Sequence, residues 1–409
     1  MTLPLNQVIV GDCTEIMRTW PEDSIDLVVT SPPYWGLRDY GLGEDQLGLE
    51  PHPQLFIDHL VEVCREIRRV LKPSGTFWLN LGDTYYGSGG KGGQYKKFMP
   101  DKGQPDHYRQ SSKARSNWLQ PKQKLMIPAR VAIALQHDDW ILRSDVIWHK
   151  LNHMPDPAKD RLTPAHEHVF LLAKQRRYYF DLEAIRVPHQ LPHDPRKTRG
   201  ESTVHDRKEF TDQYSSGWNA QDPLEGMRLG QNPGGKNPGD VWRIATTPFL
   251  GAHFATFPPK LIEPIVKAGS PRWVCSRCGK PRTRILEEVP SFKDKEIQKA
   301  ELSETRYTSE EAHNPHSLAF RRQAYRKLGL EGPPPKKTVG WTDCGCGEPW
   351  VPGVVLDPFG GSGTVGQVSR RLGRRFIIIE IKPEYAEMAR QRVQGRYKPA
   401  PEGVTPFKT

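Results

Sequence analysis

Short apolar runs bounded by turn-forming residues recur along the chain and predict buried strands. These runs are residues 8–10, 25–29, 169–172, 354–356 and 376–379. Residues 76–81 and 141–148 are predicted as further strands. Between two of them, the apolar positions follow a helical spacing: Leu55, Leu60, Cys64, Ile67 and Leu71. Residues 72–75 are expected to end that helix, and Pro128 to open another. Strands that alternate with helices predict an α/β fold, with a doubly wound, mostly parallel sheet covered on both faces.

The clearest unit lies near the C-terminus. A strand at Val354–Leu356 leads into the Gly-rich turn Asp357–Gly363, and a helix and a second strand ending at Glu380 follow. Glycines between a strand and a helix let the backbone approach a ligand, and a carboxylate after the next strand can accept from ribose hydroxyls. The unit favours a nucleotide-like cofactor, with a ligand-free tight turn as the alternative. The turn lacks Gly-Lys-Ser/Thr, which disfavours nucleoside triphosphate hydrolysis.

Three segments interrupt the alternation: 84–124, 182–240 and 270–350. The first has nine Lys or Arg against two Asp, with four Tyr, and the chain as a whole holds 36 Gly and 38 Pro. Such segments bury little apolar area, so we expect loops or small appended modules. The net charge of +11 suits a polyanionic partner.

A second motif, Thr30-Ser31-Pro32-Pro33-Tyr34-Trp35, follows a predicted strand. Two prolines remove backbone donors and stiffen the chain, which leaves carbonyl oxygens free to accept. A hydroxyl before them and an aromatic ring after them suit a planar base with an exocyclic amine. On its own, the motif fits equally well a proline-rich strand exit with an aromatic side chain packed on it.

Together, Ser31-Pro32-Pro33-Tyr34 and Asp357-Pro358-Phe359-Gly360-Gly361-Ser362-Gly363-Thr364 resemble the S-adenosylmethionine-dependent DNA amino-methyltransferases. The order of the two motifs is similar to the β-type arrangement of that family. Further matching segments are 11–13, 72–76, 148–155, 166–168 and 253–258. The resemblance covers roughly 1–83, 125–180, 240–268 and 350–395, and the insertions lie outside it.

The resemblance implies a Rossmann-like methyltransferase fold with inserted DNA-recognition segments, and methyl transfer to an exocyclic amine of a base flipped out of double-stranded DNA. Ser31 and the Pro32 carbonyl would accept the amine protons beside Pro33, and Tyr34 would stack on the base. The implied cofactor-binding residues are Asp12, Phe257, Pro258, Asp357, Phe359, Gly361, Gly363, Thr364 and Glu380.

Roles within that set also follow from the resemblance. Glu380 would bind the ribose hydroxyls, Asp12 the adenine amine, and Phe257 with Pro258 would close over the methionine part. Asp12 as a turn cap and Phe257 as core packing are the alternatives.

Serine at the first motif position is typical of the family members that act on cytosine N4, so N4 is favoured, with adenine N6 as the alternative. Carbon-5 cytosine methylation is disfavoured, because it uses a cysteine nucleophile that usually follows a proline, and the sequence contains no Pro-Cys dipeptide. The competing class is a non-catalytic DNA-binding protein of the same fold. It is disfavoured because both motifs are intact.

Four of the six cysteines form two close pairs, Cys275-x-x-Cys278 and Cys344-x-Cys346. In a protein without an export signal, such pairs suggest a structural zinc site before disulfides, with four free thiols as the alternative. Cys13 and Cys64 are expected to be ordinary buried thiols. His166 and His168 flank Glu167, a pattern that is more often packing than metal binding.

We therefore expect a split core. Its segments are 1–83 (catalytic half), 84–124 (basic loop), 125–180 (core), 181–240 (target recognition), 241–269 (core), 270–350 (zinc insertion), 351–397 (cofactor half) and 398–409 (tail). The basic loop, with Lys91, Arg109 and Tyr95 among its members, is a candidate for phosphate contact and base stacking; a solubilising surface loop is the alternative.

The expected partner is double-stranded DNA, and a cognate restriction endonuclease not encoded in this chain is a further candidate. The N-terminus lacks a signal-peptide pattern and no apolar run approaches a membrane span, so a cytoplasmic location on prokaryotic DNA is expected.

Overall fold

The computed structural model describes residues 2–37, 41, 46–86, 119–188, 235–247, 257–288 and 336–396. These fall into two compact units. The first comprises the described parts of Met1–Ile185, Gly239–Arg282 and Cys344–Thr409, and the second those of Arg186–Pro238 and Thr283–Asp343. Within the described ranges, none of the helices combines the length and apolar character needed to cross a membrane.

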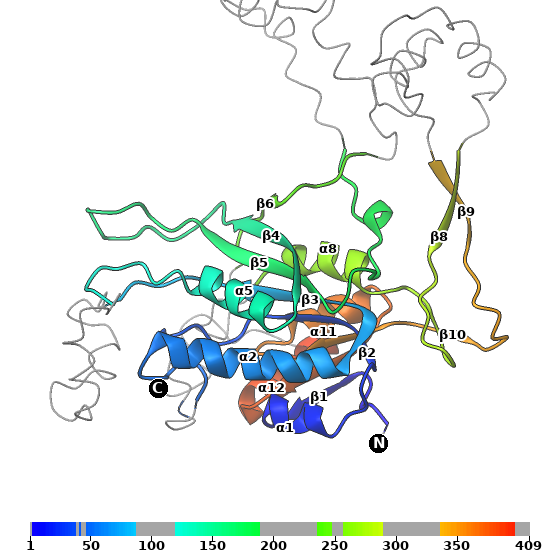
Figure 1. The fold of residues 1–409 in the computed structure, drawn as a ribbon, viewed down its shortest axis with the longest axis horizontal. Coiled ribbons are helices and arrows are strands. Elements are labelled where there is room, and N and C mark those ends of the chain that lie inside the picture. Colours follow the sequence, from blue (N-terminus) through cyan, green and yellow to red (C-terminus); the bar gives the residue numbers. More distant parts are fainter. Residues whose placement is uncertain are drawn as a thin grey trace, which may run out of the picture. The chain divides into compact units, whose positions relative to one another are not determined.

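An eight-stranded sheet forms the centre of the first unit (Figure 1). Its order is β1 (Gln7–Val10), β12 (Arg375–Glu380), β11 (Val354–Asp357), β2 (Ile25–Thr30), β3 (Leu71–Leu81), β5 (His166–Ala173), β4 (Ile141–His149) and β6 (Val241–Arg243). Only β5 runs antiparallel to its neighbours, so the prediction of a mostly parallel sheet is confirmed. The C-terminal strands β11 and β12 lie between β1 and β2, which makes the two ends of the chain parts of one sheet.

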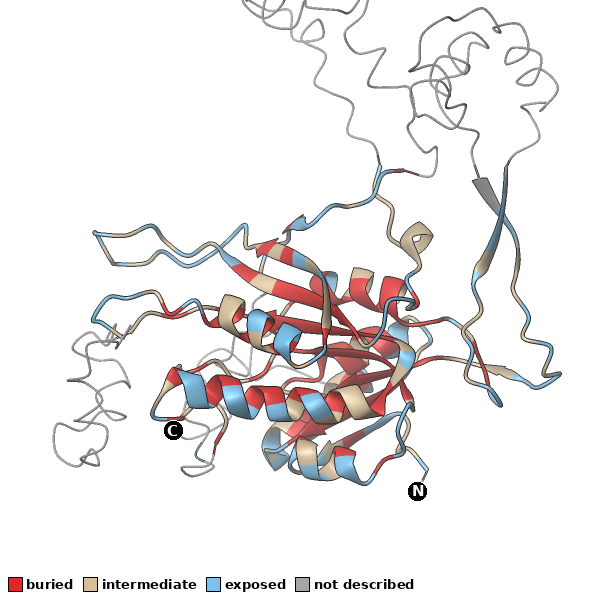
Figure 2. Cartoon of the chain, in the orientation of Figure 1, coloured by how far each residue is buried: buried red, intermediate tan, exposed pale blue. Residues whose placement is uncertain are grey.

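Helices cover both faces of this sheet, as the doubly wound prediction requires. One face carries α1 (Cys13–Arg18), α2 (Pro53–Val70) and α5 (Ile127–His137), and the other α8 (Pro259–Gly269), α11 (Thr364–Arg371) and α12 (Pro383–Val393). In Figure 1, α2 and α5 lie in front of the strands and α8 and α11 behind them. Figure 2 shows the buried residues concentrated on the strands and on the helix faces that contact them.

Helix α2 confirms part of the predicted periodicity, because Leu60, Cys64 and Ile67 are buried on one face. Leu55 is 39% exposed, Phe56 is buried in its place, and Leu71 belongs to β3. The segment 72–75 differs from expectation. The helix ends at Val70, and β3 begins at once and includes these residues as an irregular stretch between the pairs Ile25–Leu71 and Leu27–Thr76. Gly75 fits there because an added Cβ would lie 2.9 Å from the backbone oxygen of Asp26.

The second unit contains a short antiparallel pair in its described part. β8 (Arg284–Glu288) pairs with β9 (Lys336–Trp341), and the Arg284 guanidinium lies 4.9 Å from the centre of the Trp341 ring. A single bridge joins Val187 to Lys236. Most of the predicted target-recognition region, the basic loop and the tail lie outside the described residues.

Candidate active site

A cavity of about 670 Å³ opens at the carboxyl ends of β1, β2, β11 and β12. Parallel strands bring these ends to one edge of the sheet, so residues more than 300 positions apart meet there. The predicted site residues that line the cavity are Asp12, Ser31, Pro32, Pro33, Tyr34, Phe257, Phe359, Gly361, Thr364 and Glu380.

Three other predicted residues lie beside the cavity and do not line it. Pro258 caps the start of α8, and Gly363 caps the start of α11 at φ +77°. Gly363 has no room for a side chain, because an added Cβ would lie 2.8 Å from that of Ala389. Asp357 is completely buried at the end of β11.

Asp357 connects the two sequence motifs. Thr30 Oγ1, one residue before Ser31, donates to Asp357 Oδ1 at 2.7 Å, and the Phe359 amide donates to the same oxygen at 3.2 Å. Asp357 Oδ2 is buried and accepts no hydrogen bond from the described part of the chain. Burial raises the pKa of this carboxyl to about 7. A cationic or donating group of a ligand would satisfy the second oxygen.

Glu380, at the end of β12, stabilises the Gly-rich turn by accepting hydrogen bonds from backbone amides. Its Oε2 accepts from the Gly361 amide at 2.7 Å, and its Oε1 from the Lys382 amide at 2.9 Å. Gly361 has φ +49°, and a Cβ on Gly360 would lie 2.0 Å from Ile378 Cγ2, so the turn requires glycine at both positions. Burial raises the pKa of Glu380, whose carboxylate still faces the cavity.

Arg392 of α12 stabilises the same turn by hydrogen bonds to its side chains. Its Nη1 donates to Ser362 Oγ at 2.6 Å and to Thr364 Oγ1 at 2.8 Å. Nothing in the sequence pattern singles out this arginine among its many neighbours.

Tyr34 lies at the centre of a buried polar network. Its Oη donates to Glu167 Oε2 at 2.8 Å and accepts from Asn80 Nδ2 at 2.7 Å and from Ser31 Oγ at 3.3 Å. Lys150 forms an ion pair with Glu167 Oε1. Burial, followed by the nearby Glu167 charge, raises the pKa of Tyr34 well above its usual range, so the phenol stays protonated.

The ring of Tyr34 packs directly on Gly82, just after β3. An added Cβ at Gly82 would lie 2.5 Å from Tyr34 Cε2. Trp35, in contrast, is buried in the core, where its Nε1 donates to the Glu50 carbonyl at 2.8 Å.

Asp12 and Phe257 each have the structural role given as the alternative, and both also line the cavity. Asp12 caps α1 by accepting from the Glu15 amide at 2.9 Å, and it also lines the cavity. Phe257 packs against the buried cluster around α8 and lines the same cavity.

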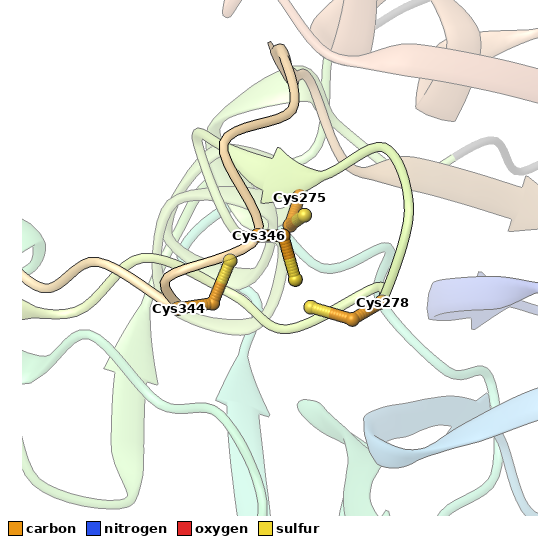
Figure 3. A group of neighbouring side chains, drawn as sticks. All are labelled: Cys275, Cys278, Cys344 and Cys346. Atoms are coloured by element: carbon orange, nitrogen blue, oxygen red, sulfur yellow. The ribbon is translucent and has the colours of Figure 1, made fainter.

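The four paired cysteines come together in the first unit. Their sulfur atoms all lie within 4.8 Å of one another, and Figure 3 shows them converging from two segments of the chain. β7 (Val274–Cys275) pairs with β10 (Trp350–Val351), which aligns Cys275 with Trp350. Backbone amides, that of Cys278 above all, lower the pKa of Cys275 to about 7. Cys13 and Cys64 are buried free thiols, as expected.

The basic loop 84–124, which is the predicted site of phosphate contact and base stacking, is only partly described. Arg161 lies 3.7 Å from the ring centre of Tyr85, and Tyr86 packs against the core. The remaining basic-loop candidates, Lys91, Tyr95 and Arg109 among them, lie outside the described residues. His168 Nδ1 lies 2.9 Å from Asp145 Oδ1, and its ring stacks on Phe170.

Sequence reasoning missed the supporting residues of Tyr34. Glu167, Asn80 and Lys150 lie at or next to strand ends, at the same edge of the sheet as Ser31. Polar residues at the ends of otherwise apolar strands were the available signal, but the pairing of β3 with β5 was not predictable from the pattern.

Comparison with known proteins agrees with this geometry. A family model described as DNA methylase matches residues 25–272 and 351–391, more than half of the chain. The type II methyltransferase M.Cfr9I of Citrobacter freundii is 33% identical over 385 residues, covering 94% of this chain and 86% of its own. M.SmaI of Serratia marcescens is 32% identical over 390 residues, covering 95% and 91%.

Among solved structures, PvuII DNA methyltransferase (cytosine-N4-specific) aligns over 97% of this chain and 87% of its own, at 17% identity and a TM-score of 0.47. The matches of the family model and of the two type II enzymes extend over both motifs and the strands that carry them. The chain therefore belongs to the DNA methylase family, whose members methylate N6 or N4 amino groups of DNA bases.

Proposed function

We propose that this protein transfers a methyl group from S-adenosylmethionine to the N4 amine of cytosine in double-stranded DNA. The observation that supports it best is the hydrogen bond from Thr30 to Asp357. It holds the strand end that carries Ser31-Pro32-Pro33-Tyr34 against the start of the Gly-rich turn. Cofactor and target base would then meet in one cavity.

The cavity contains hydrogen-bond acceptors that suit the polar groups of S-adenosylmethionine. Glu380 lines it and offers carboxylate lone pairs to the ribose hydroxyls. Asp357 lies beside the cavity and is completely buried, and its Oδ2 has no hydrogen-bond partner among the described residues. Asp12 can accept from the adenine amine while it caps α1. When bound, the sulfonium supplies an electrophilic methyl group, so no covalent enzyme intermediate is required.

The proposed base site lies at Ser31–Tyr34. An exocyclic amine is a weak nucleophile because its lone pair is delocalised into the ring. Ser31 Oγ and the Pro32 carbonyl would accept its protons and favour a pyramidal nitrogen as charge develops. Tyr34 would stack on the base, whose extrusion from the duplex costs a few kcal/mol.

Cytosine N4 is proposed over adenine N6 because the first motif position is a neutral serine, as is typical of N4 enzymes in the family that the sequence resembles. The test of the reaction itself is incubation with methyl-labelled S-adenosylmethionine and double-stranded plasmid DNA of mixed sequence. Label in the DNA is expected, and a catalytically inert chain would leave the DNA unlabelled.

Replacement of Glu380 should weaken cofactor binding. Glu380→Ala removes the ribose acceptor and the brace on Gly361, so we expect a loss of about 1–3 kcal/mol in affinity for S-adenosylmethionine. Glu380→Gln keeps one carbonyl acceptor and should lose less. Calorimetry measures both, with Glu387→Ala on exposed α12 surface as control; unchanged affinity for Glu380→Ala would remove Glu380 from the proposed site.

Replacement of Gly82 should disturb Tyr34 without touching the cofactor. The alanine Cβ would lie 2.5 Å from a rigid ring, which must move. A displacement near 1 Å costs up to about 10²-fold in rate. We expect slower single-turnover methylation at unchanged cofactor affinity. Gly340→Ala, whose new Cβ would have an ordinary 3.7 Å contact, is the control.

We also propose that Cys275, Cys278, Cys344 and Cys346 bind one structural zinc ion. Four sulfurs held 2.3 Å from one ion at tetrahedral angles lie roughly 3.8 Å apart. The sulfurs here, all within 4.8 Å of one another, need only a small adjustment. Zinc would join the two ends of the segment 283–343, and four thiolate ligands leave no position for water or substrate.

A further inference from the structure

A directed row of hydrogen bonds leads away from Ser31. Glu167, as a carboxylate, can only accept, so Tyr34 must donate its single proton to Oε2 across 2.8 Å. Tyr34 Oη therefore accepts from Ser31 Oγ at 3.3 Å. With its own proton directed toward Tyr34, Ser31 Oγ keeps its lone pairs for a donor in the cavity.

The far end of this row is charged and fixed in place. Glu167 is 9% exposed, its Oε1 is paired with Lys150, and its Oε2 also accepts from Asn80 Nδ2 at 2.7 Å. Asn80 Nδ2 donates to both Glu167 Oε2 and Tyr34 Oη and so ties the two side chains together. A negative charge thus lies two hydrogen bonds from the neutral serine.

We propose that Ser31, Tyr34 and Glu167 form a proton relay that removes the proton of the target amine. The inference rests on the proposed methyl transfer, in which a primary amine becomes a secondary one and must release a proton. Serine alone is a poor base. The relay gives it access to the Glu167 carboxylate, and Glu167 acts as a positioning residue through Tyr34.

The step balances as follows. The amine nitrogen bonds to the methyl carbon while the carbon–sulfur bond breaks and its electron pair remains on sulfur. One N–H bond of the amine breaks and leaves its pair on nitrogen. The proton passes to Ser31 Oγ, the Ser31 proton to Tyr34 Oη, and the Tyr34 proton to Glu167 Oε2. Because Glu167 lines the cavity, it can return the proton to water afterwards.

The same contacts could serve only to hold the Tyr34 ring for stacking, and Tyr34→Phe separates the two roles. Phenylalanine keeps the ring but interrupts the relay. In single-turnover reactions with excess enzyme and unmethylated plasmid DNA, we expect Tyr34→Phe and Glu167→Gln to lower the methylation rate about 10²-fold, the range for a positioned proton acceptor. Calorimetry should show unchanged affinity for S-adenosylmethionine.

Tyr178→Phe is the matched control, since it removes a phenol that accepts from Arg143 Nε at 2.9 Å on the surface. Its rate should equal that of the wild type. Rates measured across mixtures of H2O and D2O add a readout that ring anchoring would not change. A relay of several protons gives a curved dependence on deuterium content in the wild type, and Tyr34→Phe should make it linear or remove it.

A second readout needs neither cofactor nor activity. In protein labelled with ¹³Cζ-tyrosine, the resonance lost in Tyr34→Phe identifies Tyr34, and Glu167→Gln should shift it because the acceptor loses its charge. Wild-type rates in Tyr34→Phe, or an unmoved resonance in Glu167→Gln, would overturn the relay alone. A wild-type protein that methylates no DNA would overturn the proposed function and the relay with it.

Discussion

Replacement of Ser31 with alanine is expected to reduce methyl transfer by about 10²–10⁴-fold, the contribution of a positioned proton acceptor. The alanine removes the first acceptor for the amine proton and the donor to Tyr34. The turn that would bind the cofactor connects β11 to α11 and is not altered by this substitution. Affinity for S-adenosylmethionine should therefore not change.

Single-turnover methylation of plasmid DNA and calorimetry with S-adenosylmethionine measure the two quantities separately. Ser24→Ala is a suitable control, since Ser24 Oγ donates only to the Pro21 carbonyl at 2.8 Å, away from the cavity. A Ser31→Ala protein that methylates at the wild-type rate would show that another group accepts the amine proton.

Removal of zinc is expected to have the largest structural effect. Freshly purified protein should contain about one zinc per chain, and the double variant Cys275→Ser/Cys278→Ser should contain almost none. Structural zinc in small peptides contributes on the order of 10 kcal/mol to folding. Without it, four adjacent thiols would be left in two glycine-containing turns, and the two segments 275–278 and 344–346 should become more susceptible to proteolysis.

Elemental analysis and limited proteolysis provide the measurement. Cys64→Ala, which removes a buried thiol of helix α2, should leave the zinc content unchanged. Wild-type protein prepared without chelators and found to contain no zinc would contradict this assignment.

The fold could be predicted where burial dictates sequence. Strands such as β2 and β12 are buried along most of their length, so their sequences are mostly apolar, with Asp26 as an exception in β2. The turn 357–363 was recognisable because Gly360 and Gly361 have no room or no favourable backbone conformation for other residues. The irregular start of β3 was not predictable, because the pairing of Leu71 with Ile25 depends on a neighbouring strand distant in sequence.

The site could be predicted only where one short segment contains the chemistry. Ser31 and Tyr34 share a motif, and so do Phe359 and Gly361. Glu167 can accept from Tyr34 because β2, β3 and β5 are consecutive strands of the sheet. This strand order brings together residues 133 positions apart, and neither segment alone indicates it. The hydrogen bond from Thr30 to Asp357, which is completely buried, was likewise not predictable, because the two residues lie 327 positions apart.

The most direct test of the proposed reaction is the identity of the methylated base. DNA methylated by the wild-type protein is digested to nucleosides, which are separated and weighed by mass spectrometry against unmethylated DNA. The account predicts N4-methylcytosine as the new nucleoside. N6-methyladenine as the only product would contradict the assignment of the target atom, and the absence of any methylated nucleoside would contradict the proposed reaction as a whole.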